Sequence, residues 1–459
     1  MAKKHPFDYD LIVVGSGAGG SAAATIVAKE GKKVAVVEAD KFGGNSPNWS
    51  DVPMHAFLQA MQLYDTARQG SRFGLRTNTV GYNYPSLRAW KDLAVERTGT
   101  AGNRAFYHSQ GIDTFEGKAH FLSPNEISVN RRHISAEHFL IATGSEWERP
   151  PIIGLDKLPY LTPRSILEQL KPPRSLYIVG GGGVGVEIAQ LMATFGTKVY
   201  IAEIAGRLLP HEDEEAGDLI AQLLTEKAGV TVLTHARTIS VVKDSLGGYK
   251  ITYSRGETEK SLKAEAILVA GNRLPAIDLG LENAHVNYTQ AGIATDTTLQ
   301  TSAKHIYAAG DVLGTNHHTH TALLESRVAA YNILHKGRVT PDYAGTPTVV
   351  FTAPQVASVG LSADDCLKRD LHVDTALAPL SIIARSNTSD FKDGFVKLIA
   401  DKKGVILGGT IVAPDAPDMI AELSLAVRLG LTASQLATTP HAFLSWSEAV
   451  RVAASKLAK

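Results

Sequence analysis

Cysteine is almost missing from this sequence, since its 459 residues include only one, Cys366. One cysteine cannot form a disulfide within the chain, and it cannot build a metal site from several thiolates. Long hydrophobic runs are missing too, because no run approaches the roughly 20 apolar residues that a membrane span needs. The basic start Met1-Ala-Lys-Lys leads into a short expected strand and lacks the pattern of a signal peptide. We therefore expect a soluble protein of the cytoplasm.

The sequence also has no excess of charge of either sign. Lys plus Arg and Asp plus Glu both number 46. A balanced charge creates no field that would favour nucleic acid or an acidic membrane as a partner. Hydrophobic residues make up 44% and charged residues 20%, an ordinary globular balance. A chain of this length is expected to form roughly two to four domains.

A glycine-rich turn near the start has the pattern of a dinucleotide-binding fold. The apolar run 10–14 predicts a strand, the loop Gly15-Ser-Gly-Ala-Gly-Gly20 follows it, and an Ala-rich helix is expected next. A second strand at 33–37 ends at Glu38, and the acid follows the first glycine by 38 − 15 = 23 residues. This order and spacing are typical of a site for a dinucleotide.

Each residue type in this motif has a physical role. We expect Gly15 to make the tight turn, Gly17 to let the backbone approach a pyrophosphate, and Gly20 to pack the helix onto the sheet. The helix N-terminus supplies amide donors and a favourable dipole to the phosphates. Glu38 would accept hydrogen bonds from a ribose diol.

The same pattern recurs in the middle of the chain. A strand at 175–179 precedes the loop Gly180-Gly-Gly-Gly-Val-Gly185, a helix is expected from 186, and the next strand ends before Glu203. The spacing is again 203 − 180 = 23 residues. Two matching motifs make coincidence improbable, and they indicate two nucleotide-binding domains.

The acid of the second motif favours NADH over NADPH, because the Glu203 carboxylate would repel a 2′-phosphate. Arg207 lies four residues further on and offsets this repulsion only in part. Its side chain can equally be a solvated loop charge.

Further segments follow the patterns of one enzyme family. Residues 139–144 read Phe-Leu-Ile-Ala-Thr-Gly, 306–311 read Ile-Tyr-Ala-Ala-Gly-Asp, and 117–119 read Gly-Lys-Ala. Residues 351–360 read Phe-Thr-Ala-Pro-Gln-Val-Ala-Ser-Val-Gly, and 394–399 read Gly-Phe-Val-Lys-Leu-Ile. Together with the glycine loops they resemble, over essentially the whole chain, the class I pyridine nucleotide-disulfide oxidoreductases, such as dihydrolipoamide dehydrogenase, glutathione reductase and mercuric reductase.

The resemblance implies an α/β fold with two Rossmann-like domains and a C-terminal α+β dimerisation domain. The FAD domain would span 1–150 and 272–340, the NAD domain 151–271, and the interface domain of a homodimer 341–459. One looser match is 267–271, after which the family has Arg where this chain has Asn272 before Arg273. The cofactors implied are FAD and NADH, with NADPH the less favoured, and the expected contacts are Gly15, Ser16, Gly17, Ala18, Gly20, Glu38, Ala39, Asn45, Ala119, Thr143, Gly144, Gly180, Gly182, Gly183, Val184, Gly185, Glu203, Gly271, Gly310, Asp311, His318 and Thr319.

The chain departs from the family where the family keeps its redox-active disulfide. Residues 43–55 read Gly-Gly-Asn-Ser-Pro-Asn-Trp-Ser-Asp-Val-Pro-Met-His, against the family pattern G-G-x-C-x-N-x-x-C-x-P-x-K. Ser46 and Asp51 therefore stand where the family has its two cysteines. A hydroxyl and a carboxylate cannot cycle between dithiol and disulfide.

The family's proton-handling pair is altered as well. The segment His441-Ala-Phe443-Leu-Ser-Trp446-Ser-Glu448 resembles H-x-H-P-T-x-S-E. Phe443 takes the place of the catalytic histidine, and a phenyl ring cannot carry a proton. Glu448, which would orient that histidine, is retained, and His441 is expected to be structural rather than catalytic.

The family lysine near flavin N5 is replaced by His55. The resemblance implies that His55 pairs with Glu187 and supplies positive charge to the flavin when its ring is protonated. Asp51 would act in the opposite sense, because a carboxylate close to the flavin disfavours its anionic reduced form. The alternative for His55 is simple packing on its helix.

Three aromatic residues, Trp49, Phe443 and Trp446, would surround the place left by the disulfide. They could stack on a flat acceptor such as a quinone, or they could only fill volume. The run His317-His318-Thr319-His320 invites a metal site, but the family chain passes beneath the flavin here with backbone donors, so we expect no metal. Cys366 is expected to be ordinary packing or surface.

The leading hypothesis is an FAD-dependent oxidoreductase that takes hydride from NADH and passes electrons directly to a small non-disulfide acceptor such as a quinone, as a diaphorase does. Catalytic roles fall to His55, Glu187, Asp51 and Glu448. A soluble pyridine nucleotide transhydrogenase is the second possibility, since those enzymes resemble this chain in lacking a working cysteine pair. A non-catalytic flavin-binding protein with a sensing or structural role is the third.

Overall fold

The computed structural model describes residues 6–77, 79–99, 102–315, 317–336 and 338–458. The chain forms two compact units, one made of Met1–Ala56, Arg88–Glu148 and Asn272–Asp342, and the other of Phe57–Leu87, Arg149–Gly271 and Tyr343–Lys459. Two helices, α3 (Asp51–Arg68) and α4 (Tyr84–Gly99), contribute residues to both units. The three-domain boundaries expected from the sequence stay a prediction.

The first unit is built on a seven-stranded sheet in the order β3-β2-β1-β6-β5-β4, with β18 added to β6. Its elements are β1 (Tyr9–Val14), α1 (Ala18–Lys29), β2 (Val34–Glu38), α2 (Asn45–Asn48), α5 (Arg104–Ser109), β3 (Asp113–Glu116), β4 (Ala119–Ser123), β5 (Glu126–Val129), β6 (Arg132–Ile141), β7 (Ser145–Trp147), β15 (Arg273–Pro275), η4 (Leu281–Ala284), β16 (Tyr288–Thr289), β17 (Gly292–Ile293), β18 (Ile306–Ala308), η5 (Asp311–Leu313) and α9 (Thr319–Leu334).

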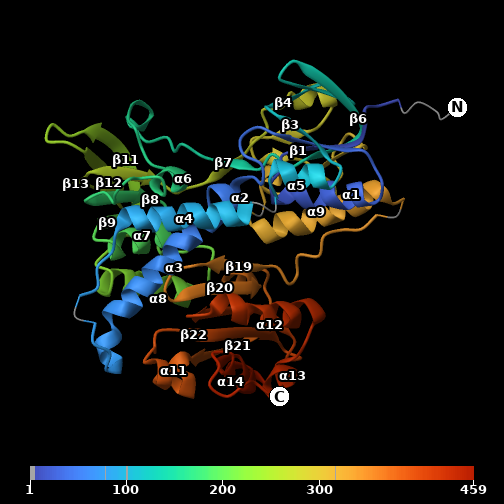
Figure 1. The fold of residues 1–459 in the computed structure, drawn as a ribbon. Coiled ribbons are helices and arrows are strands. Elements are labelled where there is room, and N and C mark those ends of the chain that lie inside the picture. The colour runs from blue at the N-terminus through green and yellow to red at the C-terminus, as the bar shows by residue number, and fades with distance from the viewer. Residues whose placement is uncertain (1–5, 78, 100–101, 316, 337, 459) are drawn as a thin grey trace. The chain divides into compact units, whose positions relative to one another are not determined.

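The strands β1, β2, β3, β6 and β18 of this sheet run parallel. Both faces of β1 and β2 are covered, which is why these strands are continuous apolar runs rather than alternating ones. Helices α1 and α9 lie side by side (Figure 1), and the Ala23 amide of α1 donates to Ser326 Oγ of α9 at 2.9 Å. Because parallel strands end at one edge, the loops after β1, β2, β6 and β18 meet there.

The second unit contains a parallel sheet in the order β10-β9-β8-β14, an antiparallel sheet β11-β12-β13, and an antiparallel sheet β19-β20-β23-β22-β21. Its elements are η1 (Gly70–Phe73), η3 (Leu155–Lys157), α6 (Pro163–Ile166), β8 (Ser175–Val179), α7 (Gly183–Thr194), β9 (Lys198–Ala202), α8 (Glu214–Glu226), β10 (Thr231–Leu233), β11 (Ala236–Lys243), β12 (Tyr249–Arg255), β13 (Thr258–Ala264), β14 (Ala266–Val269), β19 (Pro347–Val350), β20 (Gln355–Gly360), α10 (Ala363–Lys368), β21 (Val373–Pro379), η6 (Leu380–Ile382), α11 (Ala384–Ser389), β22 (Phe395–Asp401), β23 (Ile406–Ala413), α12 (Ala416–Leu429), α13 (Ala433–Thr438) and α14 (Glu448–Leu457).

The C-terminal sheet forms a core of its own with the helices around it. Helices α12 and α14 bury apolar faces against β20–β23, and the buried set includes Leu423, Ala453 and Trp446. This arrangement and the two parallel sheets confirm the α/β class with two Rossmann-like folds and a C-terminal α+β domain. Across the described residues, no helix is both long and apolar enough to cross a lipid bilayer.

Candidate functional site: two nucleotide loops and a carboxylate cluster

The first glycine loop connects β1 to α1, and its geometry requires glycine. Gly15 has φ +104°, and a Cβ placed on it would lie 2.2 Å from the Ala142 carbonyl oxygen. A Cβ on Gly20 would lie 2.1 Å from the Gly15 carbonyl oxygen. Gly17 is the N-cap of α1, so the helix begins three residues earlier than the sequence predicts. Ala18, the first helical residue, therefore lies at the amide-rich end of α1.

Glu38 organises this loop from the end of β2. Its Oε2 accepts from the Ser16 amide at 2.9 Å and from the Ser16 hydroxyl at 2.6 Å, and its Oε1 accepts from the Asp40 amide at 2.9 Å. Ser16 Oγ in turn accepts from the Gly43 amide at 2.9 Å. Glu38 thus bonds to the glycine loop and to Asp40, the residue after Ala39, and Ser16 ties the loop to the segment that carries Gly43.

A buried tyrosine that sequence reasoning missed supports the same loop. The Tyr107 hydroxyl donates to the Ser16 carbonyl at 3.2 Å, and the side chain is fully buried. Burial raises the pKa of Tyr107, and the charge of Glu38 adds to this, so the phenol stays protonated as a donor.

The second loop, between β8 and α7, repeats this plan. Gly180 has φ +110°, and a Cβ on it would lie 2.4 Å from the Ala270 carbonyl oxygen. Gly182 is the N-cap of α7, so Gly183, Val184 and Gly185 form its first turn. The Glu203 carboxylate accepts from the Gly181 amide at 2.7 Å and from the Ala205 amide at 2.8 Å.

Both loops fit a bound dinucleotide. The N-cap of each helix is glycine, so no side chain competes with a phosphate for the first amides. A Cβ on Gly144, Gly182 or Gly271 would meet nothing within 4 Å, which leaves open space beside these backbones. In the first unit, the buried atoms Asn48 Oδ1 and Thr321 Oγ1 have no hydrogen-bond partner within the part of the chain described. A bound polar group could satisfy them.

The segment after β18 is held by buried charges. The Gly310 amide donates to Glu325 Oε2 at 2.7 Å, and Glu325 is 1% exposed. Asp311 Oδ2 accepts from Ser145 Oγ at 2.7 Å and lies 3.1 Å from an Arg273 nitrogen. Sequence reasoning missed Glu325, although a glutamate on an otherwise small and apolar helix face was a usable signal.

Asp311 stays ionised in this setting. Burial alone would raise its pKa, but the nearby His317 ring, the Arg273 charge and the hydrogen bond from Ser145 hold the pKa below its ordinary value.

Two other residues that are predicted to contact the cofactor belong to the same unit. Thr143 Oγ1 donates to the Ala276 carbonyl at 2.7 Å, and Ala119 is buried at the start of β4.

Ser46 and Asp51 lie in direct contact. Ser46 Oγ donates to Asp51 Oδ2 at 2.6 Å, and Thr319 Oγ1 donates to the same oxygen at 2.6 Å. Ser50 Oγ donates to Asp51 Oδ1 at 3.0 Å and accepts from Asn45 Nδ2 at 3.1 Å. Asp51 begins α3 and Thr319 begins α9, so the carboxylate lies at two positive helix ends. We name these residues, Asn45, Ser46, Ser50, Asp51 and Thr319, the carboxylate cluster.

The predicted pair of His55 and Glu187 is divided between the two units. His55 is exposed on α3, whereas Glu187 is 7% exposed on α7 and accepts from the Phe351 amide at 2.8 Å. Their pairing stays a prediction.

Glu448 and the two aromatic residues of the C-terminal segment lie in different surroundings. Glu448 Oε2 accepts from the Leu444 amide at 3.1 Å, and Phe443 is 74% exposed. Trp446 is buried in the C-terminal core and contacts the Phe391 ring edge-on. Trp446 thus packs in this core, and its contact with an acceptor stays a prediction. Trp49, the third of these aromatic residues, lies in the segment that carries the carboxylate cluster, and the Lys41 ammonium lies over its ring.

His441, which is expected to be structural, makes two contacts within its own part of the chain. Its Nε2 lies 2.8 Å from Glu422 Oε1 and its Nδ1 lies 2.9 Å from the Thr439 carbonyl oxygen. The two contacts fix the turn that precedes Phe443 to α12.

The histidine run lies at the start of α9. His318 is its N-cap, and the rings of His318 and His320 stack with centroids 5.3 Å apart. Burial lowers the pKa of His318, and the adjacent His320 adds to this. The described residues contain no group of three or more His, Cys, Asp or Glu side chains that could hold a metal ion. Cys366 is buried in α10.

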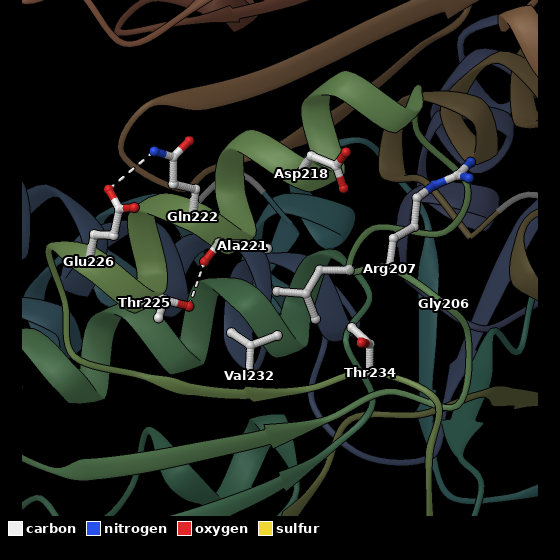
Figure 2. Close-up of a pocket in the computed structure, with 10 residues that line it drawn as sticks. Gly206, Arg207, Asp218, Ala221, Gln222, Thr225, Glu226, Val232 and Thr234 are labelled. Atoms are coloured by element: carbon white, nitrogen blue, oxygen red, sulfur yellow. Dashed lines mark hydrogen bonds between the residues drawn. The ribbon is translucent and has the colours of Figure 1, made fainter. Parts of the chain in front are cut away.

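Arg207 is not a solvated loop charge. Its guanidinium donates to Asp364 at 2.8 Å, and Asp364 raises the pKa of Arg207 further. Arg207 borders a pocket of about 390 Å³ that lies between α8 and β10 (Figure 2). Figure 2 shows the polar residues Asp218, Gln222 and Glu226 of α8 along the other side.

Comparisons with known proteins agree with this geometry. Residues 9–326 match the model of the pyridine nucleotide-disulphide oxidoreductases, and 346–454 match the dimerisation domain of the same group. The chain is 32% identical over 460 residues to a dihydrolipoyl dehydrogenase of Bacillus subtilis, covering 98% of this chain and 96% of that protein. It is 33% identical over 455 residues to a mercuric reductase of Streptomyces lividans, covering 97% of this chain and 95% of the relative.

Solved structures give the same result. The structure of LpdA from Mycobacterium tuberculosis has a TM-score of 0.88 and 26% identity, with 98% of this chain and 100% of that chain covered. The HOCl-induced flavoprotein disulfide reductase RclA from Escherichia coli has a TM-score of 0.87 and 26% identity, with 97% and 99% covered.

Proposed function

Because the chain belongs to the pyridine nucleotide-disulphide oxidoreductases, a family that binds FAD and uses NAD(P)H, we propose that it oxidises NADH and passes the electrons directly to a small acceptor that is not a disulfide. The observation that carries this proposal is the contact between Ser46 and Asp51. They stand where the resemblance places two cysteines, and their 2.6 Å hydrogen bond joins a hydroxyl to a carboxylate. Neither group can accept electrons.

The cofactor supplies the redox chemistry when bound, because a flavin takes a hydride and can release electrons to another acceptor. The chain's own residues bind and orient. The α1 N-terminus and Glu38 would hold the pyrophosphate and ribose of FAD, and Asp311 would hold its ribityl chain. The α7 N-terminus and Glu203 would hold NADH in the same way. For a quinone Q, the reaction balances as NADH + H⁺ + Q → NAD⁺ + QH₂.

The proposed preference for NADH is supported by the surroundings of Glu203 and Arg207. Glu203 is 7% exposed and is oriented by two backbone amides, so its charge is fixed beside the loop. Arg207 is engaged by Asp364, so less of its charge is available for a 2′-phosphate. A carboxylate beside a ribose accepts from its hydroxyls and repels an added phosphate.

The proposed acceptor is a flat molecule such as a quinone. Trp49, the C-cap of α2, lies two residues before Asp51 and brings an aromatic ring to the segment that carries the carboxylate cluster. The exposed ring of Phe443 supplies a second apolar surface on the dimerisation domain of an expected homodimer. Aromatic rings of this kind stack on planar acceptors.

Anaerobic mixing of the FAD-loaded protein with NADH tests the proposal. We expect bleaching of the flavin absorbance, and then steady NADH oxidation when menadione is added. Cys366→Ala serves as the control, because it removes the one thiol and should leave both reactions intact. Turnover of dihydrolipoamide that disappears in Cys366→Ala would contradict the proposal. Bleaching without turnover by any quinone would contradict the proposed acceptor class.

A further inference from the structure

Helix α7 contacts the segment that follows β19, in addition to carrying the second glycine loop. Glu187 and Gln190 lie three residues apart on α7 and so share one face of the helix. Glu187 Oε1 accepts from the Phe351 amide at 2.8 Å. Gln190 Oε1 accepts from the Ala353 amide at 2.7 Å, and Gln190 Nε2 donates to the Ala353 carbonyl at 2.9 Å. Two side chains of one helix thus bind alternate residues of a single segment.

The segment begins beside the nucleotide loop. A Cβ placed on Gly183 would lie 3.2 Å from Val350 Cγ2, so the valine side chain covers the first turn of α7. Val350 is 5% exposed, and Thr352 is fully buried. Val350 therefore lies next to the helix end where the dinucleotide phosphates are proposed to lie, and residues 351–353 continue from it along α7 through the contacts with Glu187 and Gln190.

The chemistry of the two contacts differs. Glu187 is 7% exposed, and a carboxylate that accepts from an amide makes a charge-assisted hydrogen bond, which is stronger than a neutral one. Gln190 needs both an acceptor and a donor, because it bonds to the amide and the carbonyl of the same residue. A glutamine in place of Glu187 would keep an acceptor, whereas a glutamate in place of Gln190 would lose the donor.

From these contacts we infer that Glu187 and Gln190 are positioning residues, which hold residues 350–353 as one wall of the NADH site. The inference rests on the proposed function, since it assumes that NADH binds at the Gly180 loop. It assigns Glu187 a role through the backbone of Phe351, separate from its expected pairing with His55. It also gives the dimerisation domain a part in binding the nicotinamide cofactor.

The test compares four variants of the FAD-loaded protein: Glu187→Ala, Glu187→Gln, Gln190→Ala and Gln190→Glu. Two properties are measured, hydrogen exchange at the Phe351 and Ala353 amides, and the NAD⁺ dissociation constant by titration calorimetry. We expect Glu187→Ala and Gln190→Ala to speed exchange at the contacted amide and to weaken NAD⁺ binding about tenfold. Glu187→Gln should keep amide protection and NAD⁺ affinity within about twofold. Gln190→Glu keeps the acceptor for the Ala353 amide but loses the donor to its carbonyl, so amide protection should persist while NAD⁺ binding weakens.

Val350→Ala is a matched variant that removes the wall without touching either contact. It should weaken NAD⁺ binding while the Phe351 and Ala353 amides keep their protection. The inference is overturned if Glu187→Gln loses NAD⁺ affinity as fully as Glu187→Ala while the Phe351 amide stays protected, because the charge would then be the active feature. Absence of NAD⁺ and NADH binding to the unaltered protein would instead refute the proposed function.

Discussion

The two nucleotide loops are built on one plan but are secured to different degrees. In each, the first glycine has a positive φ and lies against a carbonyl oxygen, and an acid 23 residues later accepts from two backbone amides. The amides belong to equivalent positions, Ser16 and Asp40 in the first loop and Gly181 and Ala205 in the second. The shared plan follows from the need to place bare helix amides beside a pyrophosphate.

The difference lies in the second residue of each loop. Ser16 adds a hydroxyl that bonds Glu38 and the Gly43 amide, and Tyr107 bonds its carbonyl. Gly181 has no side chain to contribute, and a Cβ there would lie 2.6 Å from Leu208 Cδ2, so its contact with another segment is the bond that its carbonyl accepts from the Leu209 amide at 2.9 Å. The first loop is thus tied to two other segments of its unit. We infer that this suits a resident cofactor, while the barer second loop suits one that is exchanged at each turnover.

The largest expected effect comes from replacing the first glycine of either loop. Gly15→Ala and Gly180→Ala each force a Cβ to within 2.4 Å of a carbonyl oxygen at a φ above +100°. Backbone strain alone costs on the order of 1–3 kcal/mol, and the overlap adds to it. We expect each unfolding free energy, measured with urea, to fall by roughly 3 kcal/mol or more, with loss of FAD in Gly15→Ala.

Gly182→Ala is the control for these variants, because its added methyl group meets no atom within 4 Å and its φ is −73°. Stability should change by less than about 1 kcal/mol. NAD⁺ affinity should still fall, since the methyl group occupies the side that the pyrophosphate approaches. Unchanged stability in Gly180→Ala would show that the loop can relax and would break the parallel between the two folds.

Substitutions at the second residue of each loop test whether the difference between Ser16 and Gly181 matters for FAD retention and for stability. Ser16→Gly removes a buried hydroxyl that makes two hydrogen bonds, and we expect a loss of about 1–2 kcal/mol and faster release of FAD. Gly181→Ser should also destabilise, because its Cβ would meet Leu208 and the Glu203 Cβ at 2.8 Å. FAD release is followed by fluorescence after dilution, and unfolding by urea titration. If Ser16→Gly retained FAD as well as the unaltered protein does, the role given to the Ser16 hydroxyl would be contradicted.

The sequence predicts the loops well because their geometry is local. The turn, the helix N-terminus and the acid depend on residues within about one βαβ unit, so spacing alone identifies Gly15, Glu38, Gly180 and Glu203. The contacts of Glu325 and Tyr107 were missed, because each reaches a loop from another part of the chain. Thr319 was expected to contact the cofactor, but its bond to Asp51 joins residues 268 positions apart and no spacing predicts it.

The His55 and Glu187 pair shows a different limit. The pairing of the two residues that the resemblance implies stays a prediction, and the structure adds for Glu187 a backbone partner, Phe351, that the family pattern does not predict. Motifs identify residue types, whereas the partners of a buried carboxylate depend on tertiary packing. Trp446 makes the same point, since its pattern fitted a site and its burial fits a core.

A smaller effect is expected on cofactor choice at the second loop. Asp364→Asn removes the charge that engages Arg207, and the freed guanidinium can attract a 2′-phosphate. Exposed ion pairs contribute on the order of 1 kcal/mol or less, so the ratio of kcat/KM for NADPH to that for NADH should rise up to about fivefold. Glu203 keeps its repulsion, and NADH should remain the better substrate. An unchanged ratio would mean that Arg207 does not contact the cofactor and that Glu203 alone determines the preference for NADH over NADPH.

The smallest effect concerns acid stability, where the two folds differ again. The first has the buried Asp311 beside Arg273 after β18, whereas the sheet of the second ends at β14 and, within the residues that the structure describes, has no strand that corresponds to β18. The pKa of Asp311 is lowered in the folded state, so its contribution is present above the unfolded pKa of about 4 and is lost as pH falls through the folded value. Arg273→Gln should raise that pKa and reduce the unfolding free energy at pH 7 by about 1 kcal/mol.

Urea unfolding at pH 7 and at about pH 3 measures this difference. The gap between the unaltered protein and Arg273→Gln should narrow at the lower pH, because the contribution of ionised Asp311 is lost progressively as pH falls below the unfolded pKa toward the lowered folded pKa. Arg273 also lies over the ring of Trp147, a contact that does not depend on the charge of Asp311, so part of the gap should persist at both values. A gap of the same size at pH 3 and pH 7 would mean that the stacking on Trp147, rather than the ion pair, is what secures the segment after β18.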